Sequence, residues 1–174
     1  MRSIIAGPAS SSMEMLQPFL EHHSTLTLAT VSPAGGAAAA DLYFASDGSF
    51  KLYFLSESDS RHAENIKANP QVAVTVHARA WDWREIKGLQ LEGECRRVTA
   101  PAERAAALAR YARKFSFIGS LAQIGVNAFL AKAIARHAVY QITPSWIRWL
   151  DNGEAFGHKE EWSWRDGGWI AGRG

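Results

Sequence analysis

The sequence predicts a mainly β, α+β protein built on an antiparallel barrel or sheet, and three observations lead to this fold class. About six short apolar segments alternate with the strand period of two. Most of these segments follow one another through short turns rich in glycine, proline and aspartate, which typically join antiparallel neighbours. Helical segments are inserted at irregular places instead of alternating with strands, which disfavours a parallel βαβ sheet.

The first half of the chain predicts one helix and a meander of three strands. Met13–His22 places apolar residues at helical spacing, with Ser11 or Ser12 as the N-cap. Strand-like alternation then covers residues 24–32, 37–45 and 49–56. The last two strands flank Asp47-Gly48, a pair that supplies the positive φ of tight hairpin turns.

The middle of the chain predicts a short helix between strands. Arg61–Ala68 is amphipathic and ends at Asn69-Pro70, because proline disfavours helical geometry in the residue before it. Residues 71–78 and 85–98 read as the fourth and fifth strands. Gly88 and Gly93 interrupt the fifth strand, where a bulge or a close backbone approach is expected.

The last third begins with an alanine-rich helical insertion over about residues 101–136, which we expect to form two helices with a break near Gly119 or Gly125. Ala138–Thr143 and Trp146–Asp151 then read as two strands separated by Pro144. The remaining tail, about residues 152–174, is rich in tryptophan and glycine and is assigned no regular element.

Length and composition fit a globular protein of one domain over residues 1–174. The chain has 47% hydrophobic and 21% charged residues. Its formal net charge of +2 gives no reason to expect nucleic acid or an anionic membrane as a partner. The N-terminal apolar run is too short for a signal peptide, and no window approaches the roughly 18 apolar residues of a membrane span. We therefore expect a cytoplasmic protein.

Several common kinds of site find no support in the sequence. The single cysteine, Cys95, excludes an internal disulfide and lies in a strand-like run, where a buried and inert thiol is expected. The six histidines show no metal-ligand spacing, so no metal site is predicted. No nucleophile elbow or nucleotide-binding glycine motif occurs. A basic run in the alanine-rich segment reads as a solvated helix face in preference to a nucleic-acid surface: Arg104, Arg110, Arg113 and Lys114.

The stretch "LSESDSRHAENIKANP", from Leu55 to Pro70, places hydroxyls and an arginine where a strand gives way to a helix. A helix N-terminus presents unpaired N–H groups and a partial positive charge, which favour phosphate. Ser56, Ser58, Ser60 and Arg61 would add hydroxyl donors and a guanidinium to such a site. The plainer interpretation is that Ser60 caps the helix and Arg61 is a solvated charge, and on residue types alone this is the commoner case.

Three segments in order, "TLATVSPAGG", "LYFLSESDSRHAENIKANPQVAVTV" and "IKGLQLEGECRRV", resemble the FMN-binding split-barrel superfamily of pyridoxamine 5'-phosphate oxidase. The C-terminal "IRWLDNGEAFGHKEEW" is similar to an uncharacterised bacterial branch of it. The resemblance covers about residues 19–98 and 139–164. It implies a six-stranded antiparallel split β-barrel of Greek-key type with flanking helices. It also implies a homodimer with two FMN sites, each built from both subunits.

By position, the resemblance assigns the FMN phosphate to Ser56, Ser60, Arg61 and His62. His62 stands where the oxidase carries lysine, so the affinity for phosphate becomes dependent on pH. Further flavin contacts are implied for a second group of residues: Gln90 on the fifth strand, Trp149 packing on the flavin of the partner subunit, and Lys159 as a charge partner. The alternatives for this group are a polar residue on a half-exposed strand for Gln90, and core or interface packing for Trp149.

The predicted function is an FMN-dependent oxidoreductase of unknown small-molecule substrate. In the oxidase an arginine and a lysine serve from the strand that here reads "AAAADLYF", residues 37–44, so pyridoxamine 5'-phosphate oxidase activity is not predicted. No side chain stands out as a general acid or base, which leaves a non-catalytic flavin-binding or sensing module as the alternative. The related barrels also use F420 or haem, the latter with His62 or another histidine as axial ligand.

Overall fold

The computed structural model describes residues 9–115 and 136–172. The described elements, in chain order, are α1 (Ala9–His22), β1 (Thr25–Val31), β2 (Ala37–Ser46), β3 (Leu52–Glu57), α2 (Arg61–Ala68), β4 (Gln71–His77), the 3-10 helix η1 (Trp83–Glu85), β5 (Lys87–Arg97), α3 (Pro101–Lys114), β6 (His137–Asp151), β7 (Lys159–Arg165) and β8 (Gly168–Ala171). None of the described helices has the length and apolar character needed to cross a membrane.

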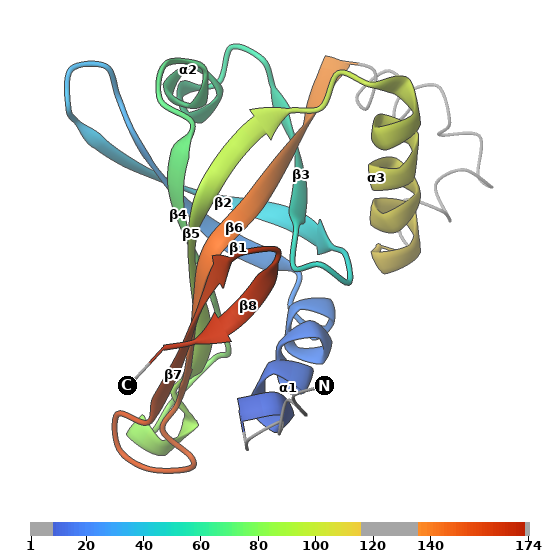
Figure 1. The fold of residues 1–174 in the computed structure, drawn as a ribbon. Helices are drawn as coiled ribbons and strands as arrows, with labels where there is room; N and C mark the ends of the chain where they lie inside the picture. The colour runs from blue at the N-terminus through green and yellow to red at the C-terminus, as the bar shows by residue number, and fades with distance from the viewer. Residues whose placement is uncertain (1–8, 116–135, 173–174) are drawn as a thin grey trace.

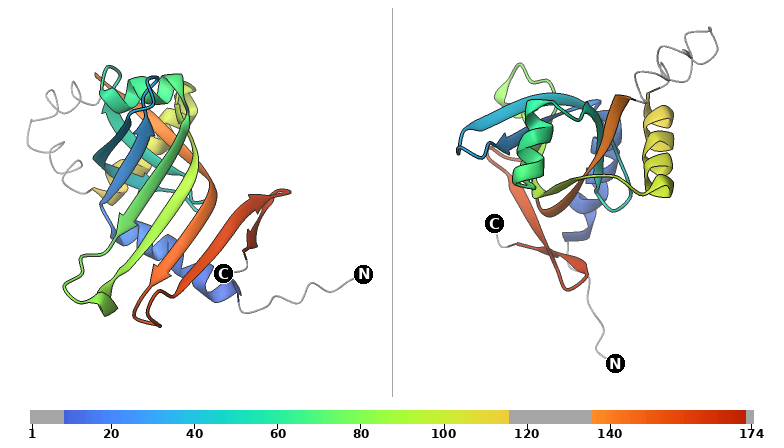
Figure 2. Two further views of the ribbon diagram at one scale, coloured as in Figure 1. Left: turned by 90° about the vertical axis from the view of Figure 1, so that its left-hand side faces the viewer. Right: turned by 90° about the horizontal axis from the view of Figure 1, so that it is seen from above.

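The strands β1 to β6 form a closed antiparallel barrel (Figure 1). Their order is β3-β2-β1-β4-β5-β6, and pairing of β3 with β6 closes the ring. The strand β4 follows β3 in the chain but lies beside β1, which is the Greek-key connection. The predicted six-stranded split barrel is therefore confirmed. Figure 2 shows α2 at one end of the barrel, α1 near the other, and α3 along its outer side.

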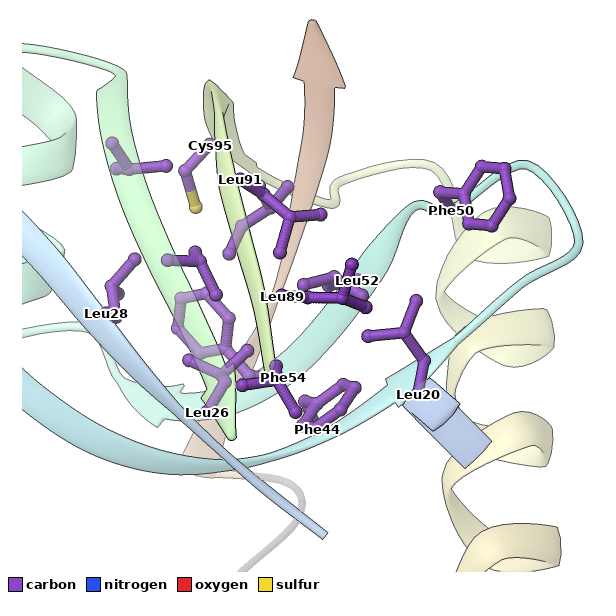
Figure 3. Close-up of a cluster of buried hydrophobic side chains, with 14 of the residues drawn as sticks. Leu20, Leu26, Leu28, Phe44, Phe50, Leu52, Phe54, Leu89, Leu91 and Cys95 are labelled. Atoms are coloured by element: carbon purple, nitrogen blue, oxygen red, sulfur yellow. The ribbon is translucent and has the colours of Figure 1, made fainter. Parts of the chain in front are cut away.

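The barrel core follows the alternation seen in the sequence. Every second residue of β1 and β4 is buried, as shown by Leu26 and Leu28 on β1 and by Val74 on β4. Figure 3 shows such side chains converging from several strands, with the rings of Phe44 and Phe54 among them. Both rings are fully buried. Because each strand contributes one face to the interior, burial of apolar area favours this closed arrangement.

The helix α1 packs against the barrel through Leu16 and Leu20, both fully buried. It begins at Ala9, so Ser11 and Ser12 lie inside the helix and the prediction that one of them is the N-cap is wrong. Serine has a moderate helix propensity, so it is tolerated inside a helix. Packing of the apolar residues that follow stabilises the helix, which therefore extends toward the N-terminus past the serines.

The turn between β2 and β3 differs from the predicted tight hairpin. Positive φ occurs at Phe50 (63°) and not at Gly48. The Asp47 carboxylate accepts from the backbone N–H of Ser49 (2.9 Å) and of Lys51 (3.1 Å), which stabilises a longer turn. The Phe50 side chain is 9% exposed, so its burial offsets the unfavourable backbone conformation.

The strand β6 is one continuous element, so the prediction of two strands separated by Pro144 is wrong. Its register with β5 shifts between Glu92 and Gly93, and Gly93 lies opposite Pro144. The missing proline N–H therefore falls at a bulge, where the ladder is already interrupted. A Cβ on Gly93 would clash with the Thr143 carbonyl, which confirms the close approach expected at this glycine.

The tail contains a hairpin that the sequence analysis did not assign. The strand β7 pairs with the second half of β6 and then with β8. Asp166 and Gly167 both have positive φ, 52° and 82°, as the tightest hairpin turns require. Trp162 is 2% exposed and joins the main core, so part of the tryptophan-rich tail contributes to the core.

The helix α3 confirms the first part of the alanine-rich insertion, and the expected second helix lies outside the described residues. The basic run is not a uniformly solvated face. Lys114 Nζ donates to the Leu20 carbonyl at 2.8 Å, and the Arg104 guanidinium donates to the His137 carbonyl at 3.3 Å. These two side chains tie α3 to α1 and β6, because backbone carbonyls at element ends need donors.

Candidate functional site

The turn from β3 into α2 brings together three of the predicted phosphate residues. Ser56 lies near the end of β3 with 6% of its surface exposed. Ser60 is the N-cap of α2, and its hydroxyl accepts from the Ala63 N–H at 3.4 Å. His62 follows in the first turn of the helix. The cap predicted for Ser60 is confirmed, and it places the Ser60 hydroxyl beside the other two side chains.

These three side chains form a closed hydrogen-bonded triangle, here called the Ser–His cluster (Ser56, Ser60 and His62). The Nε2 atom of His62 lies 2.6 Å from Ser56 Oγ and 3.0 Å from Ser60 Oγ. The two hydroxyl oxygens lie 3.0 Å apart. The Ser60 hydroxyl also contacts the Glu57 carbonyl at 2.9 Å. The cluster therefore concentrates three rotatable polar groups at the start of one helix.

The electrostatics of this turn depend mainly on Arg61 and the helix end. Burial lowers the pKa of His62, so its imidazole is neutral near pH 7. The Arg61 side chain is exposed beside the cluster. The first N–H groups of α2 have no carbonyl partner within the helix and carry its partial positive charge. Exposed Glu57 and Asp59 precede the helix, so the surface of the turn carries charges of both signs.

A buried hydrogen bond fixes α2 on the barrel. Asn65 Nδ2 donates to Thr30 Oγ1 of β1 at 3.0 Å, and the two residues are 3% and 2% exposed. Ala63 and Ile66 pack into the main core on the same side of α2. The first turn of the helix is therefore held in a defined place, although its own side chains lie nearer the surface.

The other predicted flavin residues lie far from the Ser–His cluster within one chain. Ser56 is opposite Ala138 on β6, whereas Gln90 is opposite Arg148 on the same strand. At about 3.3 Å per residue these positions are roughly 30 Å apart. Trp149 follows directly, and Lys159 begins β7, which pairs with this end of β6.

The surroundings of this second group differ from residue to residue. Trp149 is 4% exposed and packs edge-on against Phe19, with ring centroids 4.9 Å apart, so its contacts within the chain are those of core packing. Gln90 is exposed and accepts from Arg148 Nη1 at 3.1 Å. Lys159 is exposed. The flavin contacts assigned to all three remain predictions.

Arg148, which the sequence analysis did not single out, contacts one of the predicted flavin residues. Its Nε donates to Glu161 Oε1 at 2.8 Å while Nη1 reaches Gln90, and its guanidinium lies 4.8 Å from the Trp146 ring centroid. The alternation of "SWIRWLD" places Arg148 and Trp146 on one face of β6, and this signal was available in the sequence.

The arrangement around α2 is suited to binding an anion and not to nucleophilic catalysis. A serine–histidine pair becomes a nucleophile when a third group orients the imidazole. Among the described residues no carboxylate contacts His62. The hydroxyls, Arg61 and the N–H groups of the first helical turn are instead the donors that phosphate requires, so the residues present fit the phosphate end of FMN.

Sequence comparison finds relatives of this chain. Residues 12–151 match the family model described as pyridoxamine 5'-phosphate oxidase. A UPF0306 protein of Yersinia pestis bv. Antiqua (strain Angola) is 30% identical over 149 residues, covering 86% of this chain and 91% of that protein. A UPF0306 protein of Photorhabdus laumondii is 27% identical over 154 residues, covering 88% of this chain and 97% of that protein.

Solved structures share the fold at low sequence identity. A pyridoxamine 5'-phosphate oxidase-related, FMN-binding protein from Nostoc punctiforme has a TM-score of 0.64 and 15% identity, covering 98% of both chains. The haem-storage protein HutZ from Vibrio cholerae has a TM-score of 0.58 and 21% identity, covering 75% of this chain and 88% of that one. Because the family model spans residues 12–151 of 174, the chain belongs to the pyridoxamine 5'-phosphate oxidase family.

Proposed function

We propose that this protein binds FMN, with the phosphate held by Arg61 and the Ser–His cluster at the start of α2. The observation that carries the proposal is the convergence of Ser56, Ser60 and His62 within 3.0 Å of one another, beside an exposed arginine. The FMN-binding relative with the same fold supports the choice of ligand.

Each residue of the site has a distinct task in this proposal. Arg61 supplies the permanent charge, and a guanidinium pairs with two phosphate oxygens at once. The hydroxyls of Ser56 and Ser60 rotate from His62 toward the ligand, so no backbone movement is needed. His62 orients both hydroxyls while neutral and adds a positive charge when protonated.

The proposed site takes its remaining contacts from a second copy of the chain. Gln90, Trp149 and Lys159 lie about 30 Å along β6 from the Ser–His cluster, farther than one FMN molecule reaches from the phosphate. A homodimer that sets one end of the barrel beside the opposite end of its partner brings the two groups together. The small side chains of Ala37–Ala40 on β2 would permit a planar ring to approach the barrel closely.

When bound, the isoalloxazine ring supplies hydride or electron transfer, and we propose an FMN-dependent oxidoreductase acting on a small molecule. The chain supplies binding, orientation and a phosphate anchor. Oxidation of pyridoxamine 5'-phosphate is not part of the proposal, because Ala37–Ala40 occupies the strand from which the oxidase presents basic residues.

The test is FMN binding, followed by quenching of flavin fluorescence at fixed salt. The substitution Arg61→Ala removes the charge at the start of α2, and Lys67→Ala removes one at its end as a matched control. Loss of a charged hydrogen-bonding partner is expected to weaken binding by about ten- to a hundredfold for Arg61→Ala, with little change for Lys67→Ala. Equal binding by both variants would remove the proposed phosphate site.

The same preparation decides between cofactor classes. A Soret band in the protein as purified would favour haem, which the haem-storage protein of the same fold binds, over FMN as the cofactor. Tight FMN binding without reduction by nicotinamide cofactors would favour the non-catalytic flavin-binding module. Binding of F420 in place of FMN would keep the proposed anion site and change the redox cofactor.

A further inference from the structure

A pocket lies between α2 and the ends of β5 and β6. Its volume is about 600 Å³. Its lining comes from the turn before α2, from α2 and the proline after it, and from the ends of β5 and β6. None of the residues of the Ser–His cluster lines it. The pocket is therefore a separate feature of the same end of the barrel.

The charges on this pocket have one sign. Lys67, Arg96 and Arg97 line it, and no acidic residue from the described part of the chain does. Arg96 is neutralised by Glu103 of α3 at 2.6 Å. Within residues 9–115 and 136–172, neither Lys67 nor Arg97 forms an ion pair. A cavity lined by charges of one sign attracts counter-ions more strongly than a flat surface does.

The rest of the lining is apolar or neutral. Ala63, Ile66 and Cys95 are at least 95% buried, and the Cys95 side chain lies among the core residues of Figure 3. Burial raises the pKa of Cys95 to about 12, so the thiol is uncharged. Tyr140 is 4% exposed, lies directly opposite Arg97 in the sheet, and is hydrogen-bonded with Ser58. Its phenol is a neutral donor at the wall of the pocket.

We propose that this pocket binds a small organic anion with an apolar body, whose carboxylate or phosphate contacts Arg97, Lys67 and the Tyr140 hydroxyl. The apolar body lies against Ile66, Ala63 and Cys95. Burial of apolar area and two uncompensated cations act together on such a molecule, whereas inorganic phosphate or a neutral aromatic compound has only one of the two contributions. The site does not require FMN.

Cys95 provides the measurement, because it is the only cysteine of the chain and it lines the pocket. Its alkylation by N-ethylmaleimide is followed by mass spectrometry with 2-naphthoate, 2-naphthyl phosphate, 2-naphthalenemethanol or inorganic phosphate present. At ten times its Kd a bound probe slows the reaction by about tenfold. Slowing is expected with the two naphthyl anions and not with the alcohol or inorganic phosphate. The anion that protects Cys95 more strongly carries the preferred head group, carboxylate or phosphate.

Variants separate this pocket from the rest of the surface. Arg97→Gln and Lys67→Gln are each expected to weaken probe binding about tenfold or more, reducing protection at the same concentration to about twofold. Arg79→Gln, an exposed arginine at the opposite end of β4, is the matched control and keeps full protection. Arg61→Ala is also expected to keep full protection of Cys95. The outcome of this test therefore does not depend on whether the proposed FMN site is correct.

Thermal unfolding with the same probes is the second measurement. If Cys95 does not react even without a probe, a rise of Tm with naphthoate concentration that disappears in Arg97→Gln supports the proposal. The proposal is overturned if the naphthyl anions neither protect Cys95 nor raise Tm. It is also overturned if Arg97→Gln and Lys67→Gln respond as the wild type does, or if the neutral alcohol protects Cys95 as well as the anions do.

Discussion

His62 contacts two serine hydroxyls through a ring that burial keeps neutral. Protonation of this imidazole would cost the folded chain a desolvated charge and would make Nε2 a donor to the serine hydroxyls. A bound phosphate reverses the first of these effects, since it stabilises the imidazolium. His62 is therefore expected to lower the stability of the free protein at acidic pH. At the same pH it is expected to strengthen the binding of a phosphate group.

The first prediction concerns stability at mildly acidic pH. The folded-state pKa of His62 lies below the unfolded value of 6.5, so the unfolded chain binds the proton more readily. Its contribution to stability is thus complete above pH 6.5 and is lost as the pH falls through the lowered pKa. His62→Gln is expected to show a smaller fall of Tm between pH 7.5 and pH 5.5 than wild type. An equal fall of Tm in both proteins would show that His62 is not the source of this pH dependence.

The second prediction concerns Lys114, whose ammonium lies 3.7 Å from the Phe44 ring centroid. Burial lowers its pKa from 10.5 to about 8. The unfolded chain holds this proton over the interval between the two values, so stability attributable to Lys114 rises as the pH increases from 8 to 10.5. Chemical unfolding across that interval should show the rise in wild type and its loss in Lys114→Met. Lys67→Met, at an exposed lysine, is the control and keeps the rise.

At the scale of elements, the buried hydrogen bond between Asn65 and Thr30 helps to fix α2 on the barrel. Thr30→Val removes the hydroxyl while nearly keeping the shape, and leaves the Asn65 amide unpaired in the core. The free energy of unfolding is expected to fall by about 1–3 kcal/mol in urea titrations. FMN affinity should fall as well, because the start of α2 is positioned through this contact. Thr75→Val, at an exposed position of β4, serves as control.

The long strand β6 depends on one glycine. Gly93→Ala would place a methyl group against the backbone of Thr143 and Pro144. The variant is expected to lose about 1–3 kcal/mol of stability, since neither neighbouring backbone segment can move without breaking the ladder. Gly48→Ala is the matched control, because a Cβ there meets no atom within 4 Å and φ is not positive. Similar melting temperatures for the two variants would contradict this view of the bulge.

At the scale of the whole molecule, the proposed FMN site joins the Ser–His cluster of one subunit to Lys159 of its partner. Mixed dimers provide a test. Arg61→Ala and Lys159→Ala each damage both sites of their homodimers, whereas a dimer containing one copy of each has one site with both lesions and one intact site. About a quarter of the wild-type FMN-binding capacity should return on mixing equal amounts, because random exchange makes about half of the dimers mixed and each mixed dimer has one intact site of two. Tagged subunits verify the exchange, and no recovery in verified mixed dimers would refute a shared site.

Features that depend on neighbouring residues in the chain were predictable from the sequence. The strands β1 and β4 follow from their alternation, and Ser60 was recognised as a cap from its place before α2. The Ser–His cluster spans only seven positions, from Ser56 to His62, so the sequence already brings it together. The hairpin β7–β8 carried a signal at Asp166-Gly167, but its exposed Trp164 and Ile170 conceal the usual alternation.

Features that depend on distant residues were not predictable. Pro144 reads as a break, and only the glycine opposite it on β5 shows why the strand continues. The pocket between α2 and the ends of β5 and β6 is lined by both Tyr140 of β6 and Lys67 of α2, which are far apart in the chain. The burial of the Trp149 side chain likewise depends on α1, whose Phe19 packs against it. In each case the partner that decides the outcome lies far away in the chain.

The pairing of β3 with β6 joins Leu52 to Ile142 and Glu57 to His137. During synthesis the ribosome releases β1 to β5 well before β6, so the nascent chain leaves two strands without their final neighbours. Unpaired apolar edges readily pair with other chains. The incomplete barrel is therefore expected to be more prone to aggregation than the closed one. A pause in translation between β5 and β6 lengthens that exposure.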